Sequence, residues 1–148
     1  MTTPSPSSTS TPIRSEKVVQ ATAERVDMPA GGSAELTVRV AIDEGYHVNA
    51  NPPSYSYLIA TELAVPNANG LSSGKVSYPT ALKKKFEFAE NDLAVYEGQV
   101  ELKTMLKADT SASKGEHTIP ATLRVQACDN QVCYPPGTIN LQISVSIR

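Results

Sequence analysis

The sequence contains no tryptophan, only two cysteines and two histidines, and aromatic residues make up 5% of its 148 positions. Without tryptophan, the chain lacks the Cys…Trp…Cys pattern of antibody domains. Its formal net charge of −2 argues against a nucleic-acid partner held by bulk charge. No apolar stretch approaches the roughly 18 residues that a membrane span requires. The N-terminus also lacks the pattern of a signal peptide. We therefore expect a soluble globular chain.

Eleven of the first twelve residues are Thr, Ser or Pro. Such a segment has almost no apolar surface to bury, so residues 1–14 are predicted to be a disordered tail or linker. It could be a tether between a membrane anchor and a domain, or a linker of no consequence, and the composition favours neither. The remaining residues, 15–148, are enough for one domain with a hydrophobic core.

Apolar and polar residues alternate along much of this domain. A period of two indicates strands with one buried face. The alternation is clearest over 34–42, 98–106, 117–128 and 138–148. Weaker strands are predicted over 17–26, 46–50, 61–65 and 92–96.

Turn-forming clusters separate these strands, among them "MPAGGS", "NANG", "YEGQ" and "YPPG". The pairs Pro52-Pro53 and Pro135-Pro136 belong in loops or edges, because proline has no N–H for a sheet ladder. Seven or eight short strands with this spacing predict an all-β, immunoglobulin-like β-sandwich.

Cys128 and Cys133 are the strongest functional signal, in the stretch "ACDNQVCYPPG". If odd positions 119–127 face the core, Cys128 faces away from it. Cys133 follows in a turn before the last strand. We therefore expect both thiols near the surface. A disulfide closing so short a loop stabilises by roughly 2 kcal/mol, against about 4.7 kcal/mol for a 100-residue loop.

Three uses of this pair are open from spacing alone. The spacing does not decide between a structural hairpin disulfide and a redox couple. Because zinc needs four ligands, a zinc site would have to recruit His47 and His117, which is much less favoured. A non-catalytic secreted β-sandwich module with a purely structural disulfide is therefore the alternative to a redox domain.

Several motifs together resemble one family. "QACDNQVCYPPGT", "DEGYHVNANPPSYSYLIATEL", "GKVSYP" with "KKKFEF", and "LAVYEGQVELKTML" occur in the order found in the N-terminal domain of the thiol:disulfide interchange protein DsbD. The resemblance covers about residues 15–148. It implies an immunoglobulin-like sandwich with an inserted catalytic and cap subregion.

The resemblance also implies a function. Such a domain is a protein-disulfide reductase without a bound cofactor or metal, outside the bacterial cytoplasmic membrane and tethered to it in the full-length protein. It takes electrons from a membrane-embedded donor through a thioredoxin-like domain. It passes them to thioredoxin-fold proteins, either disulfide isomerases or cytochrome c maturation thioredoxins. No nucleic acid takes part, and we expect a monomer.

Residue roles carry over from the family in the same way. Cys133 would form the mixed disulfide with a partner, and Cys128 would resolve it. A cap loop at about Lys83–Leu93 would shield the pair with Phe86 or Phe88. The ring between the cysteines is one residue shorter than in the best-studied members, and the cap begins with lysines instead of carrying their acidic residues. Apart from the resemblance, Tyr46, Tyr55, Tyr57 and Tyr134 are expected to line the site, because tyrosine offers a flat apolar face with a polar tip. Asn49 is expected there too, in shaping a rigid loop more than in chemistry.

Overall fold

The computed structural model describes residues 14–148, so the predicted tail lies outside the described residues except for Arg14. The described chain is built of strands, preceded by one 3₁₀ turn, η2 (Ser15–Lys17). The strands are β1 (Val19–Ala23), β2 (Val26–Met28), β3 (Ser33–Ile42), β4 (His47–Asn49), β5 (Glu62–Ala64), β6 (Leu71–Ser73), β7 (Leu82–Lys84), β8 (Leu93–Tyr96), β9 (Gln99–Ala108), β10 (Gly115–Val125), β11 (Ala127–Cys128) and β12 (Gly137–Ile147).

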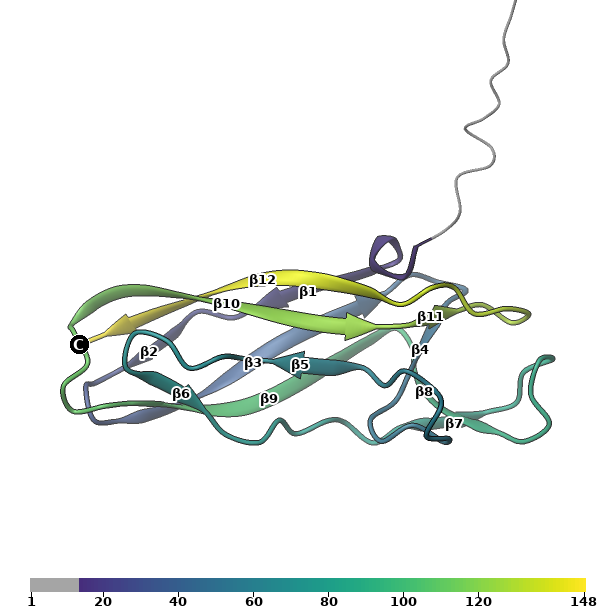
Figure 1. The fold of residues 1–148 in the computed structure, drawn as a ribbon, viewed down its shortest axis with the longest axis horizontal. Helices are drawn as coiled ribbons and strands as arrows, with labels where there is room; N and C mark the ends of the chain where they lie inside the picture. Colours follow the sequence, from purple (N-terminus) through teal and green to yellow (C-terminus); the bar gives the residue numbers. More distant parts are fainter. Residues whose placement is uncertain (1–13) are drawn as a thin grey trace, which may run out of the picture.

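Two four-stranded sheets form a sandwich, in the strand orders β1-β3-β9-β6 and β2-β12-β10-β5 (Figure 1). The long hairpin of β10 and β12 pairs over the full length of both strands, from Gly115↔Ile147 to Val125↔Gly137. One pairing, β2 with β12, is parallel. The predicted all-β, immunoglobulin-like sandwich is confirmed.

The core lies between these two sheets and follows the predicted alternation. Along β10, residues 119, 121, 123 and 125 are buried, and the residues between them are exposed. β3, β9 and β12 alternate in the same way. The inward side chains of all four strands join one apolar cluster. Burial of one face of each strand therefore holds the sandwich together.

A third, smaller sheet extends the sandwich at one end, in the order β11-β4-β8-β7. Figure 1 shows β4, β7, β8 and β11 gathered at the end opposite the C-terminus. The chain enters this sheet directly after β10, since Gln126 separates Val125 from β11. The two cysteines therefore lie where the sandwich gives way to the third sheet.

Two local features lie outside the predicted strands. β7 ends at Lys84, and Phe86 and Phe88 sit in a turn closed by a hydrogen bond from the Ala89 N–H to the Phe86 carbonyl (3.2 Å). The strands β6 and β7 were not predicted, because three-residue edge strands carry too little periodicity to detect. Over residues 14–148, no element is a helix of the length and hydropathy that a membrane crossing requires.

Candidate redox site

Cys128 and Cys133 form a disulfide, with their Cα atoms 3.9 Å apart. Cys128 ends β11, and Cys133 lies in the loop that follows, where the two residues also form an isolated antiparallel bridge. The two are very unequally exposed. Cys128 has 0% exposed surface, whereas Cys133 is exposed. Only one end of the disulfide therefore faces solvent.

The prediction that Cys128 lies near the surface is wrong. Its exclusion from the main core was correct, because the core cluster contains Ala127 but not Cys128. However, β11 pairs with β4 in the third sheet, where Cys128 stands opposite His47. A second layer of side chains covers that face, so pointing away from the core does not mean exposure.

The loop between the cysteines is held by its own hydrogen bonds. The Asp129 carboxylate accepts the backbone N–H groups of Gln131 and Val132, both at 2.8 Å, and the Tyr134 hydroxyl also donates to it. Aspartate at the start of a turn typically accepts such bonds. The hydrogen bond from Tyr134 lowers the pKa of Asp129, and the same bond raises the pKa of Tyr134 to about 12. A carboxylate and a neutral phenol thus brace the loop at neutral pH.

A stack of three aromatic rings covers the cysteine side of β4. The His47 ring lies 4.1 Å from the Phe86 ring at 18°, and Phe88 stacks beside Phe86 at 5.5 Å and 9°. Phe86 is 4% exposed and Phe88 is 38% exposed. Because His47 stands directly opposite Cys128, the cap segment (residues 83–93) packs over the strand pair that carries the buried cysteine.

The cap has a small apolar cluster separate from the main core. It consists of Phe86, Leu93 and Val95, with Tyr55, Leu58 and Ala89 packed against it. The apolar packing of the cap is therefore distinct from the packing of the sandwich core.

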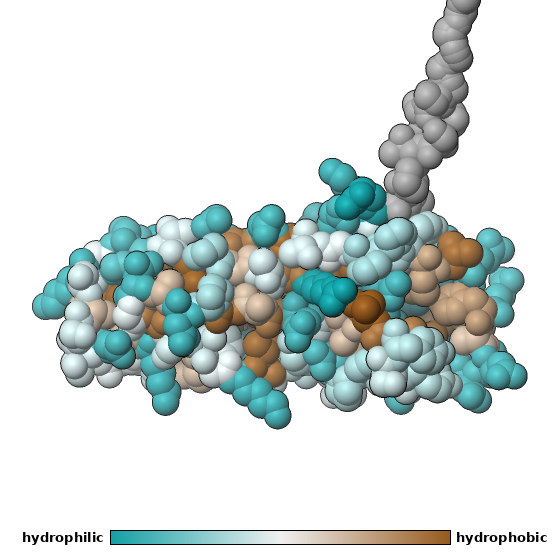
Figure 2. All heavy atoms as spheres, in the orientation of Figure 1, coloured by the Kyte–Doolittle hydropathy of each residue, from teal (hydrophilic) through white to brown (hydrophobic). Residues whose placement is uncertain are grey.

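Cys133 lies at the edge of the cap. A groove brings it together with the 55–58 loop and with the cap itself; its lining residues include Tyr55, Tyr57, Leu58, Phe88 and Cys133. Figure 2 shows hydrophobic side chains reaching the surface at this end of the molecule. Val132 (50% exposed) and Tyr57 (77% exposed) contribute to this surface. The exposed cysteine therefore stands beside apolar and aromatic side chains.

His47 has an unusual environment for a histidine. It is 1% exposed, and its Nε2 has no hydrogen-bond partner among the described residues. Burial lowers its pKa to about 4, although the carboxylates of Glu97 and Asp129 act in the opposite direction. The ring is therefore uncharged at neutral pH, which suits its stacking on Phe86.

The residue that opens the domain is fastened to the cysteine loop. Ser15 is fully buried, and its hydroxyl donates to the Pro135 carbonyl (2.6 Å) and accepts the Ala127 N–H (2.9 Å). These partners lie on either side of the disulfide in sequence. Ser15 thus fixes the start of the described domain to the cysteine loop.

The other residues predicted to line the site lie near it in different ways. Tyr46 and Tyr134 pack against each other, with ring centroids 6.1 Å apart. Asn49 is buried. Its side-chain amide donates to the Ile59 carbonyl (2.9 Å), and its backbone carbonyl accepts a hydrogen bond from the Thr61 hydroxyl (2.8 Å). Asn49 therefore anchors the loop that follows β4, while Tyr134 belongs to the cysteine loop itself.

Sequence reasoning missed Asp129 and Ser15 as parts of this site, and it considered His47 only as a possible zinc ligand. Asp129 could have been found from the Asp-Asn pair that opens the turn. No comparable local signal marks the other two, since burial of His47 depends on the cap and burial of Ser15 on the cysteine loop. Among residues 14–148, no three His, Cys, Asp or Glu side chains are arranged to hold a metal ion.

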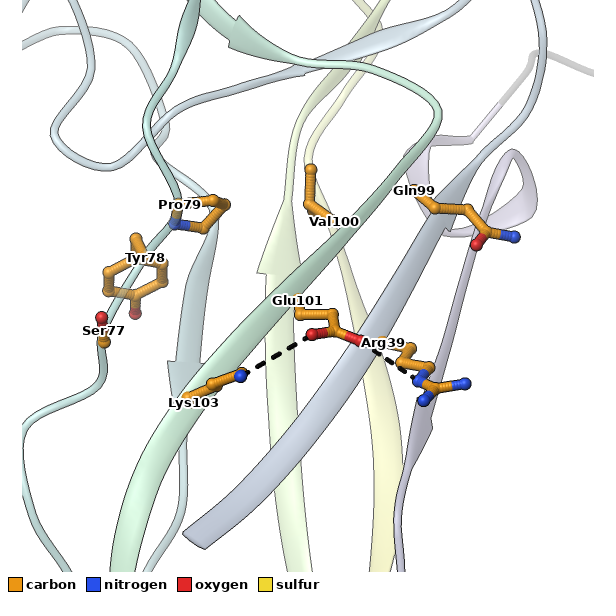
Figure 3. Close-up of a pocket in the computed structure, with 8 residues that line it drawn as sticks. All are labelled: Arg39, Ser77, Tyr78, Pro79, Gln99, Val100, Glu101 and Lys103. Carbon is orange, nitrogen blue, oxygen red and sulfur yellow. Dashed lines mark ion pairs between the residues drawn. The ribbon is translucent and has the colours of Figure 1, made fainter.

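A second groove lies on the outer face of β3 and β9, away from the cysteines (Figure 3). Its charged residues pair with one another: Glu101 contacts Arg39 at 3.4 Å and Lys103 at 3.9 Å. Exposed pairs of this kind contribute little energy. The charged side chains that line this groove are held in exposed ion pairs, and the groove has no evident chemistry.

Comparison with solved structures gives fold-level similarity. The N-terminal periplasmic domain of ScsB from Proteus mirabilis matches with a TM-score of 0.57 and 18% identity, over 84% of this chain and 44% of that one. The chain thus spans less than half the length of that structure. The seventh ScaB type I cohesin from Pseudobacteroides cellulosolvens matches at TM-score 0.48 and 11% identity, over 88% of this chain and 92% of the cohesin.

The family comparison covers most of the domain. A comparison of the sequence with curated proteins gave no match. A family model described as the N-terminal domain of the thiol:disulfide interchange protein DsbD matches residues 15–144. Together with the Cys128–Cys133 disulfide, this match supports a thiol–disulfide exchange domain. The chain belongs to the family of DsbD N-terminal domains.

Proposed function

We propose that this domain relays electrons by thiol–disulfide exchange, with Cys133 as the sulfur that partners reach and Cys128 as the resolving sulfur. The observation that carries the proposal is the unequal exposure of one disulfide, 0% at Cys128 against an exposed Cys133 beside the cap groove. A thiolate must approach the sulfur that it attacks, so access decides which cysteine forms the mixed disulfide.

The electron balance has two halves. A donor dithiol first attacks Cys133, breaks the Cys128–Cys133 bond and leaves as a disulfide, so the domain gains two electrons. The Cys133 thiolate then attacks a partner disulfide and forms a mixed disulfide, and one partner thiolate leaves. Cys128 attacks Cys133, re-forms the original bond and releases the second partner thiol. Two electrons pass to the partner, and the domain returns to its starting state.

The proposed partners are thioredoxin-fold proteins. Family membership supports this class, and the groove beside Cys133 offers aromatic faces for docking. The electron donor would be a thioredoxin-like domain fed by a membrane-embedded partner. The acceptors would be disulfide isomerases or cytochrome c maturation thioredoxins. We place this activity in the periplasm, with the domain tethered to the inner membrane and monomeric.

Trapping tests the role of each cysteine. Oxidised thioredoxin is mixed with the reduced Cys128→Ser variant, and non-reducing gels and mass spectrometry detect the mixed disulfide. We expect Cys128→Ser to accumulate the adduct through Cys133. The matched control, Cys133→Ser, should accumulate much less, because its remaining thiol is buried. Equal trapping by both variants would overturn the assignment of roles.

A redox titration tests the relay itself. Working pairs have potentials of roughly −120 to −270 mV, whereas structural disulfides lie below about −300 mV. A value in the first range supports the relay. A value below the second would mean that the disulfide is a structural staple and that the domain is a non-catalytic module.

A further inference from the structure

His47 stands where it can act on the Cys128 thiol. The two residues are directly opposite each other on β4 and β11. Such antiparallel pairs project their side chains on the same face, with Cβ atoms about 5 Å apart. Both side chains are buried, at 1% and 0% exposed. An imidazole and a sulfur are thus enclosed together under the cap.

Burial of Cys128 creates a difficulty for the resolving step, in which its sulfur must attack the mixed disulfide at Cys133. The nucleophile in disulfide exchange is the thiolate, and apolar surroundings raise the pKa of a cysteine thiol. Once reduced, Cys128 would hold its proton more firmly than a free cysteine does. A nearby proton acceptor would remove that obstacle without exposing the sulfur to solvent.

The hydrogen bonding of His47 fits such an acceptor. Its Nε2 is buried without a partner among residues 14–148 in the disulfide form. A disulfide has no S–H to donate, whereas the reduced Cys128 thiol has one. A neutral imidazole has one nitrogen free to accept a hydrogen bond. Reduction therefore adds an S–H donor on the strand opposite His47 that the disulfide form lacks.

We infer that His47 accepts the proton of the Cys128 thiol during the resolving step. This inference rests on the proposed exchange function. The Cys128 S–H bond breaks as its proton passes to the imidazole, and the thiolate attacks the Cys133 sulfur of a mixed disulfide. The Cys128–Cys133 bond forms, and the partner thiolate leaves with the electron pair of the broken bond. The imidazolium then returns its proton to water or to the leaving thiolate.

Burial disfavours an imidazolium at His47, and nearby carboxylates offset part of that cost for a transient one. The charged groups that act on His47 are Glu97 beyond the end of β8, Asp129 beside β11 and Lys84 on β7. The two carboxylates favour protonation, while Lys84 opposes it and is itself paired with Glu97 at 2.9 Å. His47 also lines a hollow with Glu97 and Lys84, which gives its proton a short route to solvent.

Ring closure can be measured without a protein partner. The reduced domain is mixed in a stopped-flow instrument with excess 5,5′-dithiobis(2-nitrobenzoate), which releases one coloured thiolate on forming the mixed disulfide and a second on ring closure. The second phase is intramolecular, so its rate does not depend on reagent concentration. Rates are measured from acid to mildly alkaline pH for wild type, His47→Phe and His47→Gln.

We expect both His47 variants to close at least about tenfold more slowly at neutral pH, a threshold set below the roughly 10²–10⁴-fold that general acid–base catalysis typically contributes. Their rates should rise steeply with pH as the thiolate forms unaided, so that the deficit shrinks in alkali. His47→Phe keeps an aromatic ring against Phe86 and so separates proton transfer from stacking. His117→Gln, at the far end of β10, is the matched control and should match wild type.

The outcomes separate the inference from the proposed function. Wild-type closure at the same rate as both His47 variants would overturn the role of His47. A deficit that is equal at every pH would also overturn it, because it would indicate altered packing. Absence of a second phase in the wild-type domain would instead count against the exchange function.

Discussion

Truncation of the two cap phenylalanines should have very different effects, although the residues lie only two positions apart. Phe86 is 4% exposed and stacks on His47 at 4.1 Å, whereas Phe88 is 38% exposed on the outer side. Burying a phenylalanine contributes about 1.5–3 kcal/mol, and an aromatic pair adds about 0.5–1.5 kcal/mol. Phe86→Ala should therefore destabilise the closed cap by about 2–4 kcal/mol. Phe88→Ala should cost about 1 kcal/mol.

The loss should be local. Because Phe86 belongs to the small cluster with Leu93 and Val95 and not to the sandwich core, its removal should open the cap before the domain unfolds. About 2–4 kcal/mol corresponds to roughly a 30-fold to several-hundred-fold increase in cap opening. Amide hydrogen exchange followed by NMR measures this opening directly. The Val95 amide should exchange faster by that factor, and the Ile143 amide in the main core should hardly change.

Phe88→Ala is the matched control, since it deletes the same side chain from the same turn. Its effect on Val95 exchange should be at least several-fold smaller than that of Phe86→Ala. Equal acceleration in the two variants would refute the reasoning from the stack. Equal acceleration of Val95 and Ile143 by Phe86→Ala would show that the cap is not a separate unit.

Three more predictions concern the residues around the disulfide. Acidification from pH 6.5 to 4 should lower the free energy of unfolding by up to roughly 3 kcal/mol, because His47 takes up a proton near pH 6.5 in the unfolded chain but only near pH 4 in the folded one. In denaturant unfolding, His47→Phe should lose much less stability over the same pH range. An NMR titration midpoint near 6.5 for His47 in the oxidised wild type would disprove this prediction. Ser15→Ala leaves the buried Ala127 N–H without its acceptor and should lower the free energy of unfolding by about 2 kcal/mol in denaturant unfolding. An unchanged free energy of unfolding would mean that water replaces the hydroxyl. Tyr134→Phe should raise the pKa of Asp129 in an NMR titration while costing about 1 kcal/mol at this half-buried site. An unchanged pKa of Asp129 would mean that the hydrogen bond is absent in solution.

The sandwich could be predicted from sequence because apolar and polar residues alternate along each long strand and so mark its buried face. The alternation along β10 and β12 marks one buried face without reference to any other segment. The pairing of the third sheet could not be predicted, because three of its strands, β4, β7 and β11, are only two or three residues long. Such strands are placed by their neighbours, so their own side chains reveal little.

The alternation of residues along one strand was not enough to predict the exposure of the cysteine pair. Parity along β10 correctly removed Cys128 from the main core, but it says nothing about what lies on the opposite face. That face is covered by His47 and by a cap that comes from a separate part of the chain. The turn at Phe86 and Phe88 buries one ring and leaves the other partly exposed, which their spacing in sequence does not reveal.

The separate cap cluster also bears on the choice between a relay and a staple. A structural disulfide needs only to close its loop, and the short ring here contributes roughly 2 kcal/mol whether or not anything covers it. A pair that exchanges electrons needs one reachable sulfur and one protected from indiscriminate reaction. Cys133 and Cys128 meet these two needs, because the loop carries the first to the surface and the third sheet holds the second beneath the cap. Since the cap packs through its own cluster, access to the pair can change while the sandwich stays intact, which favours exchange over a purely structural role.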